Sequence, residues 1–511
     1  MKTVSDDLFR LVKSLNKSEK GFFKKFASKN ATGSKQNYIY LFEAIDAQET
    51  YNEEEIRRKI KDPSLLKQLP VYKVYLFNLI LKAMNLYGAY DNSESQLNDM
   101  LANIRILTSK HLYPEAKKII KKAKALAYKF DKHRFIMELL AAERHILLSS
   151  PSKNMLGKRA ELYEQQVDLV GRMLEFYTQS LLCDKITILV DHEADYSVSN
   201  NTKMLDEIIK DKNLVTDNNI TGYYARMNFY HTRLIYSGAK GNMNEILANL
   251  KNQIDFDEAN SHFIDENPQN YVFTLINYLL YAHYAKDKNK ISEARQKLES
   301  IKKKIKGKIP RETEIQILFH ASGVEMIINE KNCDIPAGRT KIKQIENDLK
   351  TYGADVPAHI KALMYVNITC FSIIDSNFSN ALKYINKILN DTELTLRSDV
   401  NDISRMLEIL VHYEMGNYDL IEYLLGSAKK FFASKNPSSK NRELLLKFFA
   451  MVIQVNKDEH PGLFDELHFN LSRSKETDVL LTFFDFISWA KSHADGKALI
   501  DVMKENSGIK N

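Results

Sequence analysis

The chain has 511 residues, a formal net charge of +7, and a composition that is 44% hydrophobic and 27% charged. This composition excludes an intrinsically disordered chain, and the length exceeds what one hydrophobic core supports, so several domains or a stacked array of repeats is expected. Only 17 glycines and 10 prolines are present. Sheets and long loops need more of these turn residues, so the scarcity favours long helices joined by short turns.

Neither a membrane span nor a secretion signal is predicted. No run of about 18 apolar residues occurs, and the opening stretch MKTVSDDLFRLVKSLNKSEKGFF lacks the apolar segment of a secretion signal. Cys183, Cys333 and Cys370 show no CxxC spacing and are expected to be reduced thiols. We therefore expect a cytoplasmic protein without a membrane partner.

The positive charge is concentrated near the N-terminus. Residues 1–130 hold 24 Lys and Arg against 14 Asp and Glu, whereas residues 131–511 hold 49 against 52. Such an asymmetry indicates a basic contact surface in the first part of the chain.

Residues 1–90 are predicted to form an N-terminal helical module of their own. Asn16 with Glu19 three residues later is typical of a capped helix start. The segment LPVYKVYLFNLILKAMNLYGAY leaves little polar surface, so it is expected to be the central, buried helix of this module.

From residue 91 to residue 470 the chain repeats one local pattern. A polar turn is followed by a large apolar or aromatic residue, by a small residue three positions later, and by apolar residues at helical spacing. In SDVNDISRMLEILVHYEMGNYDLIEYLLGSAKKFFA, Gly416 ends one amphipathic helix and Tyr418 opens the next. The other positions that define the pattern are Tyr113, Ala116, Ala294, Phe378 and Ala381.

The turns give this pattern a period of roughly 40–48 residues when positions 113, 243, 291, 378 and 418 are taken as markers. A pair of amphipathic helices cannot bury both apolar faces alone and needs similar pairs on either side. Stacked helix pairs are therefore expected over 91–470, with capping helices over 471–511.

This pattern resembles the second half of a tetratricopeptide repeat (TPR), where a small residue lets paired helices cross closely. The period is longer than that family's, about 34 residues, and the Trp and Gly of its first helix are missing. The resemblance implies an all-α fold, with the N-terminal module followed by a right-handed α-solenoid of divergent TPR-like helix hairpins. It also implies a protein or peptide partner bound on the concave face.

Motifs for catalysis and cofactor binding are absent from the sequence. HExxH, GxSxG, GxxxxGK[ST] and GxGxxG do not occur, so we expect no catalytic residue, no cofactor and no metal site. The densest group of metal-ligand residue types, Asp191 to Asp195, lacks the length and the glycine of a calcium loop. It is interpreted as a solvated acidic loop.

Two groups of basic residues are the remaining candidates for a binding surface. Residues 302–311 contain six basic side chains. The second group covers the outer side of the helix that begins near Tyr113 and consists of Lys117, Lys118, Lys121, Lys122 and Lys124. Each group is either a solvated charged face or a contact for phosphate or nucleic acid. Aromatic residues do not interleave with either group, which argues against stacking on single strands.

Three functions follow as hypotheses. The first is a non-enzymatic intracellular scaffold or adaptor whose helix array binds a peptide or protein segment. The second is a ligand-sensing regulator whose basic N-terminal module contacts DNA. The third is an enzyme whose catalytic groups converge from distant positions without a sequence motif.

Overall fold

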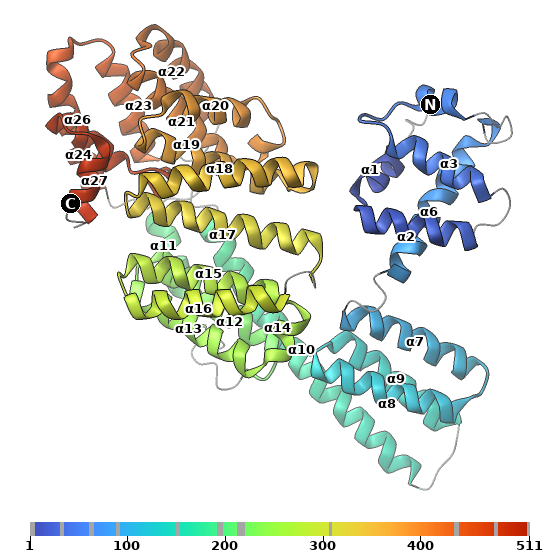
Figure 1. Cartoon of the computed structure of the whole chain (residues 1–511). Coiled ribbons are helices and arrows are strands. Elements are labelled where there is room, and N and C mark those ends of the chain that lie inside the picture. Colours follow the sequence, from blue (N-terminus) through green and yellow to red (C-terminus); the bar gives the residue numbers. More distant parts are fainter. Residues whose placement is uncertain are drawn as a thin grey trace. The chain divides into compact units, whose positions relative to one another are not determined.

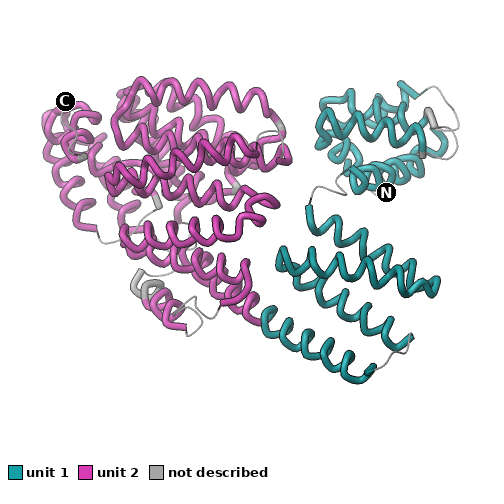
Figure 2. Tube along the Cα trace, turned by 60° about the horizontal axis from the view of Figure 1, so that its bottom comes forward, with its two compact units in different colours: residues 1–173 teal, residues 174–511 magenta. Residues whose placement is uncertain are grey.

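The computed structural model describes residues 6–30, 35–60, 66–87, 92–149, 154–191, 198–211, 220–305, 309–433, 439–474 and 479–507. Within these ranges the chain is 86% helical, with 26 α-helices and no strand, which confirms the predicted all-α class. None of these helices is long and apolar enough to cross a membrane. The chain divides into two compact units, residues 1–173 and 174–511 (Figure 2).

The N-terminal module has its own hydrophobic core, built from residues 8–84. Its helices are α1 (Asp7–Ser14), α2 (Lys17–Asn30), α3 (Lys35–Asp46), α4 (Glu53–Lys59) and α6 (Leu69–Tyr87). The predicted capped start of α2 is present. The Asn16 Oδ1 accepts a hydrogen bond from the backbone N–H of Glu19 (3.0 Å), and the Glu19 carboxylate accepts one from the backbone N–H of Asn16 (2.7 Å).

Helix α6 contacts three other helices of the module, as expected of a central helix, but only one of its sides is buried. Leu76 and Ile80 are buried, whereas Val71 and Val74 are 65% and 64% exposed. The reason is that α6 packs against α1, α2 and α3, which cover one side of it. An apolar sequence therefore marks α6 as helical without showing how many of its sides are covered.

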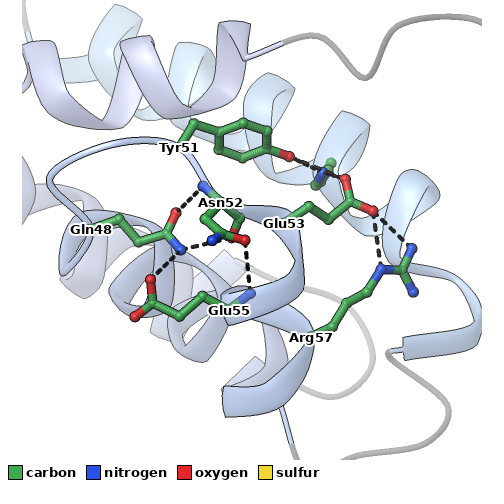
Figure 3. Close-up of polar contacts among 7 residues, drawn as sticks. Gln48, Tyr51, Asn52, Glu53, Glu55 and Arg57 are labelled. Carbon is green, nitrogen blue, oxygen red and sulfur yellow. Dashed lines mark hydrogen bonds and ion pairs between the residues drawn. The ribbon is translucent and has the colours of Figure 1, made fainter.

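Polar contacts fix the chain between α3 and α4 (Figure 3). The Gln48 side chain accepts a hydrogen bond from the backbone N–H of Asn52 (3.1 Å) and donates to its carbonyl (2.8 Å). The Asn52 side chain in turn accepts a hydrogen bond from the backbone N–H of Glu55 (3.2 Å) and caps α4. These contacts satisfy the backbone groups at this helix start.

The carboxylate of Glu53 lies at the centre of a second group of contacts in the same region (Figure 3). It accepts hydrogen bonds from Lys73 Nζ (2.5 Å) and from the Arg57 guanidinium (2.8 and 3.1 Å), and Tyr51 contacts both Glu53 and Lys73. The hydrogen bond from Lys73, with support from Arg57, lowers the pKa of Glu53 to about 2. Lys73 and Arg57 thus neutralise the negative charge of the Glu53 carboxylate.

After the module, many helices pack against the helix that precedes or follows them in the chain (Figure 1). The next eight are α7 (Ser93–Ser109), α8 (Tyr113–Lys129), α9 (His133–Ser149), α10 (Met155–Asp191), α11 (Val198–Ile209), α12 (Tyr223–Ala239), α13 (Met243–Ala259) and α14 (Ser261–Glu266). Contacts link α7 to α8, α8 to α9 and α12 to α13. The boundary between the two compact units falls inside α10.

The following eight helices form four pairs. They are α15 (Pro268–Tyr284), α16 (Lys288–Ile305), α17 (Arg311–Lys331), α18 (Ile335–Tyr352), α19 (Ala358–Ile374), α20 (Phe378–Leu389), α21 (Ser398–Glu414) and α22 (Tyr418–Ala433). Each odd-numbered helix packs on the even-numbered helix that follows it, and α15, α17, α19 and α21 also pack on one another in sequence. The odd-numbered helices therefore form a continuous layer.

One type of turn joins the two helices of each of these pairs. A residue with positive φ follows the first helix. Its backbone N–H, and that of the next residue, donate hydrogen bonds to carbonyls of the last helical turn. In the turn after α21, Gly416 donates to Tyr413 and Asn417 donates to His412. The positive-φ residues of these four turns and of the turn between α12 and α13 are Gly241, Lys286, Cys333, Ser376 and Gly416. They lie 45, 47, 43 and 40 residues apart, within the spacing predicted from the sequence.

The structure corrects the register of the pattern at two turns. Helix α16 begins at Lys288, three residues before the marker Ile291, although Ala294 is buried. Residues 331–357 contain the regular helix α18, whose start is not among the marker positions. Here Gly338 occupies the position of Ala381 in α20, and an added Cβ would lie 1.8 Å from the Phe371 ring.

At the other predicted positions the structure agrees with the pattern. Ala116 and Ala381 are fully buried, Gly416 has the positive φ that ends a helix, and Tyr113, Phe378 and Tyr418 are the first residues of α8, α20 and α22.

The C-terminal helices pack against the last pairs and share one hydrophobic core with them. They are α23 (Lys440–Val452), α24 (His460–Arg473), α25 (Val479–Phe483), α26 (Phe486–Asp495) and α27 (Leu499–Ser507). Trp489 is buried, and its Nε1 donates a hydrogen bond to Glu414 of α21 (2.6 Å). The predicted start of the capping region at residue 471 falls in the last turn of α24.

Candidate functional site

A pocket of about 600 Å³ lies on the layer of odd-numbered helices, within residues 174–511. Its walls come from α15, α17, α19 and the segment 481–485, which includes the end of α25. The volume is in the range of pockets that bind small molecules or a few side chains of a peptide, about 300–1,000 Å³.

Helical periodicity explains how α15 contributes to both the pocket and the core. Phe273, Asn277, Leu280 and Tyr284 follow one another at steps of four, three and four residues, so they share one side of the helix and line the pocket. Leu275, on another side, is fully buried in the core with α13, α16 and α17. Helix α15 therefore has two apolar sides. One packs in the core with α16, and the other lines the pocket.

Helices α17 and α19 approach each other closely at the floor of the pocket. Phe319, Gly323 and Ile327 lie on one side of α17 and line it. A Cβ at Gly323 would lie 3.0 Å from Met364 Cε and 3.3 Å from Asn367 Nδ2, both on α19. The glycine thus keeps space open where these two helices pass.

The C-terminal segment closes one end of the pocket. Helix α25 packs on α19 and α21, and Leu480 and Phe484 are buried there in the core that they share with both helices. Leu481 and Phe483 are half-buried and line the pocket instead. Part of the odd-helix layer is therefore covered by a short apolar segment of the same chain.

A small number of polar groups interrupt the apolar walls. The amides of Asn277, Gln316 and Asn367 line the pocket. The His320 ring lies 4.6 Å from the ring of Phe273, and its Nε2 is buried with no hydrogen-bond partner in the described part of the chain. Burial lowers the pKa of His320, which favours the neutral imidazole.

Glu330 is the only carboxylate that the odd-numbered helices contribute to the lining described here. It lies in the last turn of α17, is 9% exposed, and receives no hydrogen bond or ion pair on its carboxylate from the residues that the structure describes. Burial raises its pKa to about 7; the neighbouring Lys331 opposes this shift, and Asp485 adds to it. An unpartnered buried carboxylate is costly to fold, so this residue calls for a functional explanation.

The geometry of the pocket suits binding. Apolar walls with a few convergent polar groups provide affinity and orientation. The described residues contain no group of three His, Cys, Asp or Glu side chains that could hold a metal ion. One cysteine, Cys183, lies near a histidine, with its Sγ 3.7 Å from His231 Nδ1. Burial raises the pKa of the Cys183 thiol, so it is not an activated nucleophile.

The structure places the predicted lysine face on α8, away from this pocket. Lys117, Lys118, Lys121 and Lys122 are exposed. Lys124 is not: its side chain is 19% exposed, and its Nζ pairs with Glu143 of α9 (2.8 Å). The expectation of five solvated lysines is wrong for this residue because the α8–α9 packing brings a carboxylate to it.

The structure describes the other charged segments only in part. Lys302, Lys303 and Lys304 are exposed in the last turn of α16, where positive charge is favourable next to the helix C-terminus. Arg311, which begins α17, pairs with Asp355 (2.6 Å). The segment from His192 to Asp195 lies outside the described residues.

Sequence reasoning missed every residue of the pocket. The available signal was a single polar residue inside an otherwise apolar helical stretch, as with Asn277 in α15 and Asn367 in α19; Glu330 gives no such signal, because Asn329 and Lys331 flank it. A polar residue of this kind indicates that one apolar side of the helix lines a cavity and does not pack in the core.

No protein-family model, curated protein or solved structure matches the chain.

Proposed function

We propose that the chain is a non-enzymatic cytoplasmic scaffold or adaptor, in which the helix pairs stack as a right-handed TPR-like α-solenoid. Its inner face, formed by the odd-numbered helices, binds a segment of a partner protein. The observation that carries this proposal is the chain's own segment on that face. Helix α25 packs on α19 and α21 and buries Leu480 and Phe484 there, so the face accepts a short apolar segment.

The pocket continues the same face toward α15. Its apolar walls would take side chains of a partner segment, and the carboxamides of Asn277 and Asn367 each offer a donor and an acceptor to that segment's backbone. A volume of about 600 Å³ holds a few side chains, which fits an anchor site within a longer contact.

The test uses the full chain and a phage-displayed library of random dodecapeptides. Ile327→Trp fills the pocket from α17, whereas Leu420→Trp adds a tryptophan to the exposed side of α22 and serves as the matched control. We expect selected peptides to bind the wild type and the control equally, and to bind Ile327→Trp at least about tenfold more weakly. Peptides that bind all three forms alike would contradict the proposal, provided that circular dichroism shows Ile327→Trp to be folded.

The second candidate is a DNA-binding regulator. The four exposed lysines that favour DNA binding lie on α8, outside the N-terminal module that the sequence hypothesis assigned to DNA. A gel shift with duplex DNA that weakens steeply with salt would favour the regulator over the scaffold. For the third hypothesis, an enzyme, the described residues offer no activated nucleophile at Cys183, and we do not propose it.

A further inference from the structure

We infer that the pocket recognises a basic side chain, a Lys or Arg of the partner segment, whose cationic group pairs with Glu330 and Asp485. This inference rests on the proposed function and names the chemistry of the residue that enters the pocket.

The first observation is the position of Glu330. Its carboxylate lines the pocket on a residue that is 91% buried, and no described residue donates a hydrogen bond to it. Buried carboxylates in folded proteins are normally paired, because an unpaired one loses its hydration without compensation. A cation that enters the pocket supplies the missing partner.

The second observation is a second acid at the same pocket. Asp485 precedes α26 and lines the cavity from the C-terminal segment. Its oxygens accept hydrogen bonds from the backbone N–H of Ser488 (2.9 Å) and from the Ser488 hydroxyl (2.7 Å). These contacts hold the carboxylate in place and leave its charge unneutralised, so the field of Asp485 acts on Glu330.

Lys331 is the one basic side chain among the pocket residues. It is exposed and follows Glu330 on the same helix. Two carboxylates therefore oppose a single solvated ammonium, and an acidic segment would meet repulsion from both. This balance favours a cationic partner.

The apolar walls favour a side chain over a small inorganic cation. Leu280, Ile327 and Leu363 line the pocket from three helices, and Phe483 lines it from α25. Lys and Arg carry an apolar stem of three or four methylene groups beneath the charge, which matches such walls. In these surroundings water screens the ion pair less than at an open surface.

Protons compete with this ligand. Besides Lys331 and Asp485, the titratable groups that face Glu330 are Tyr284 of α15, Cys333, and Cys370 of α19. His320 and His359 also line the pocket. Burial raises the pKa of Glu330 to about 7. Protonation of Glu330 makes the pocket more positive, so binding strengthens as the pH rises from about 6 to about 8. A change of affinity with pH does not identify Glu330 as the group responsible, so a substitution of Glu330 is required.

The experiment extends the dodecapeptide selection to Glu330→Gln and Asp485→Asn in the full chain. Asn retains the capping ability of Asp at the start of α26, and Gln removes a buried charge, so both variants should fold. Glu299→Gln, at a solvated carboxylate of α16 (68% exposed side chain), is the matched control.

We expect peptides selected on the wild type to share a Lys or Arg at a fixed position. Glu330→Gln should weaken their binding at least about tenfold, and replacing the basic residue of the peptide by norleucine should cause the same loss. The two changes together should cause little further loss, because they remove the same ion pair. Glu299→Gln should leave affinity unchanged.

The inference and the proposed function fail in different ways. Peptides that are blocked by Ile327→Trp but lack a basic residue, or that bind Glu330→Gln as tightly as the wild type, overturn the inference and leave the proposed function in place. A selection that yields no peptide sensitive to Ile327→Trp overturns both.

Discussion

Glu53 and Glu330 are the same residue type, yet their carboxylates have opposite surroundings in the two regions of the chain. In the N-terminal module, Lys73 and Arg57 bond the Glu53 carboxylate and lower its pKa to about 2. On α17, burial raises the pKa of Glu330 to about 7, and no described residue pairs with its carboxylate. The first arrangement stabilises the fold. The second lowers its stability in a position that is useful only if something binds there.

The largest effect expected from this comparison is a pH dependence of stability that belongs to Glu330. The folded chain holds this proton up to a pH of about 7, whereas the unfolded chain releases it near the ordinary value of 4.5. The folded state binds more protons in between, so stability falls as the pH rises from about 4.5 to about 7, by on the order of 3 kcal/mol. Urea unfolding of the wild type and Glu330→Gln across this window measures it, and the variant should lack that fall.

Asp257 also titrates in this window, because burial raises its pKa to about 6. The difference between the two chains, not the wild-type curve, is therefore the quantity to compare. Identical pH profiles for both chains would show that Glu330 is solvated or paired, and the contrast with Glu53 would disappear.

Glu53 should show the opposite sign and a smaller effect. Its folded pKa lies below its ordinary value, so its stabilisation is present above a pH of about 4.5 and is lost as the pH falls toward 2. Glu53→Gln at pH 7 leaves Lys73, whose side chain is 12% exposed, without its carboxylate. We expect a loss of about 1–3 kcal/mol, measured by thermal or urea unfolding of the full chain. A variant that gains stability would mean that the contacts in Figure 3 do not offset the burial of these charges.

The contrast also explains how much could be predicted from the sequence. Helices, turns and caps depend on residues that lie close together in the chain, such as Asn16 with Glu19 or Gly416 with Asn417, and these predictions were confirmed. The turn at Cys333 was missed because Pro336 and Gly338, which follow it, are typical of a break between helices, although both lie in the first turn of α18.

The pocket could not be predicted for a different reason. Periodicity finds the apolar sides of α15, α17 and α19 but does not distinguish a side that packs from a side that lines a cavity. The burial of Glu330 and its proximity to Asp485 are set by tertiary packing, including the return of the C-terminal segment to α19 and α21. No local pattern encodes that return.

The smallest effects are expected on α8, where one lysine pairs with a carboxylate and four others are exposed. Lys124 has a partner, Glu143 at 2.8 Å, whereas Lys117, Lys118, Lys121 and Lys122 are exposed. Lys124→Glu places two like charges together and should cost about 1 kcal/mol. Reversing any one of the four exposed lysines should change stability by no more than about 0.5 kcal/mol.

If duplex DNA binds the chain, the same four reversals should weaken binding and flatten its dependence on salt, because each exposed lysine that contacts a phosphate releases counterions. Titrations at several salt concentrations, with Lys124→Glu as the comparison, measure this. A folded quadruple variant that keeps the wild-type salt dependence excludes this face as the DNA contact. That result would leave the four lysines as a solvated face of α8, in contrast to Glu330, a buried carboxylate with no partner among the described residues.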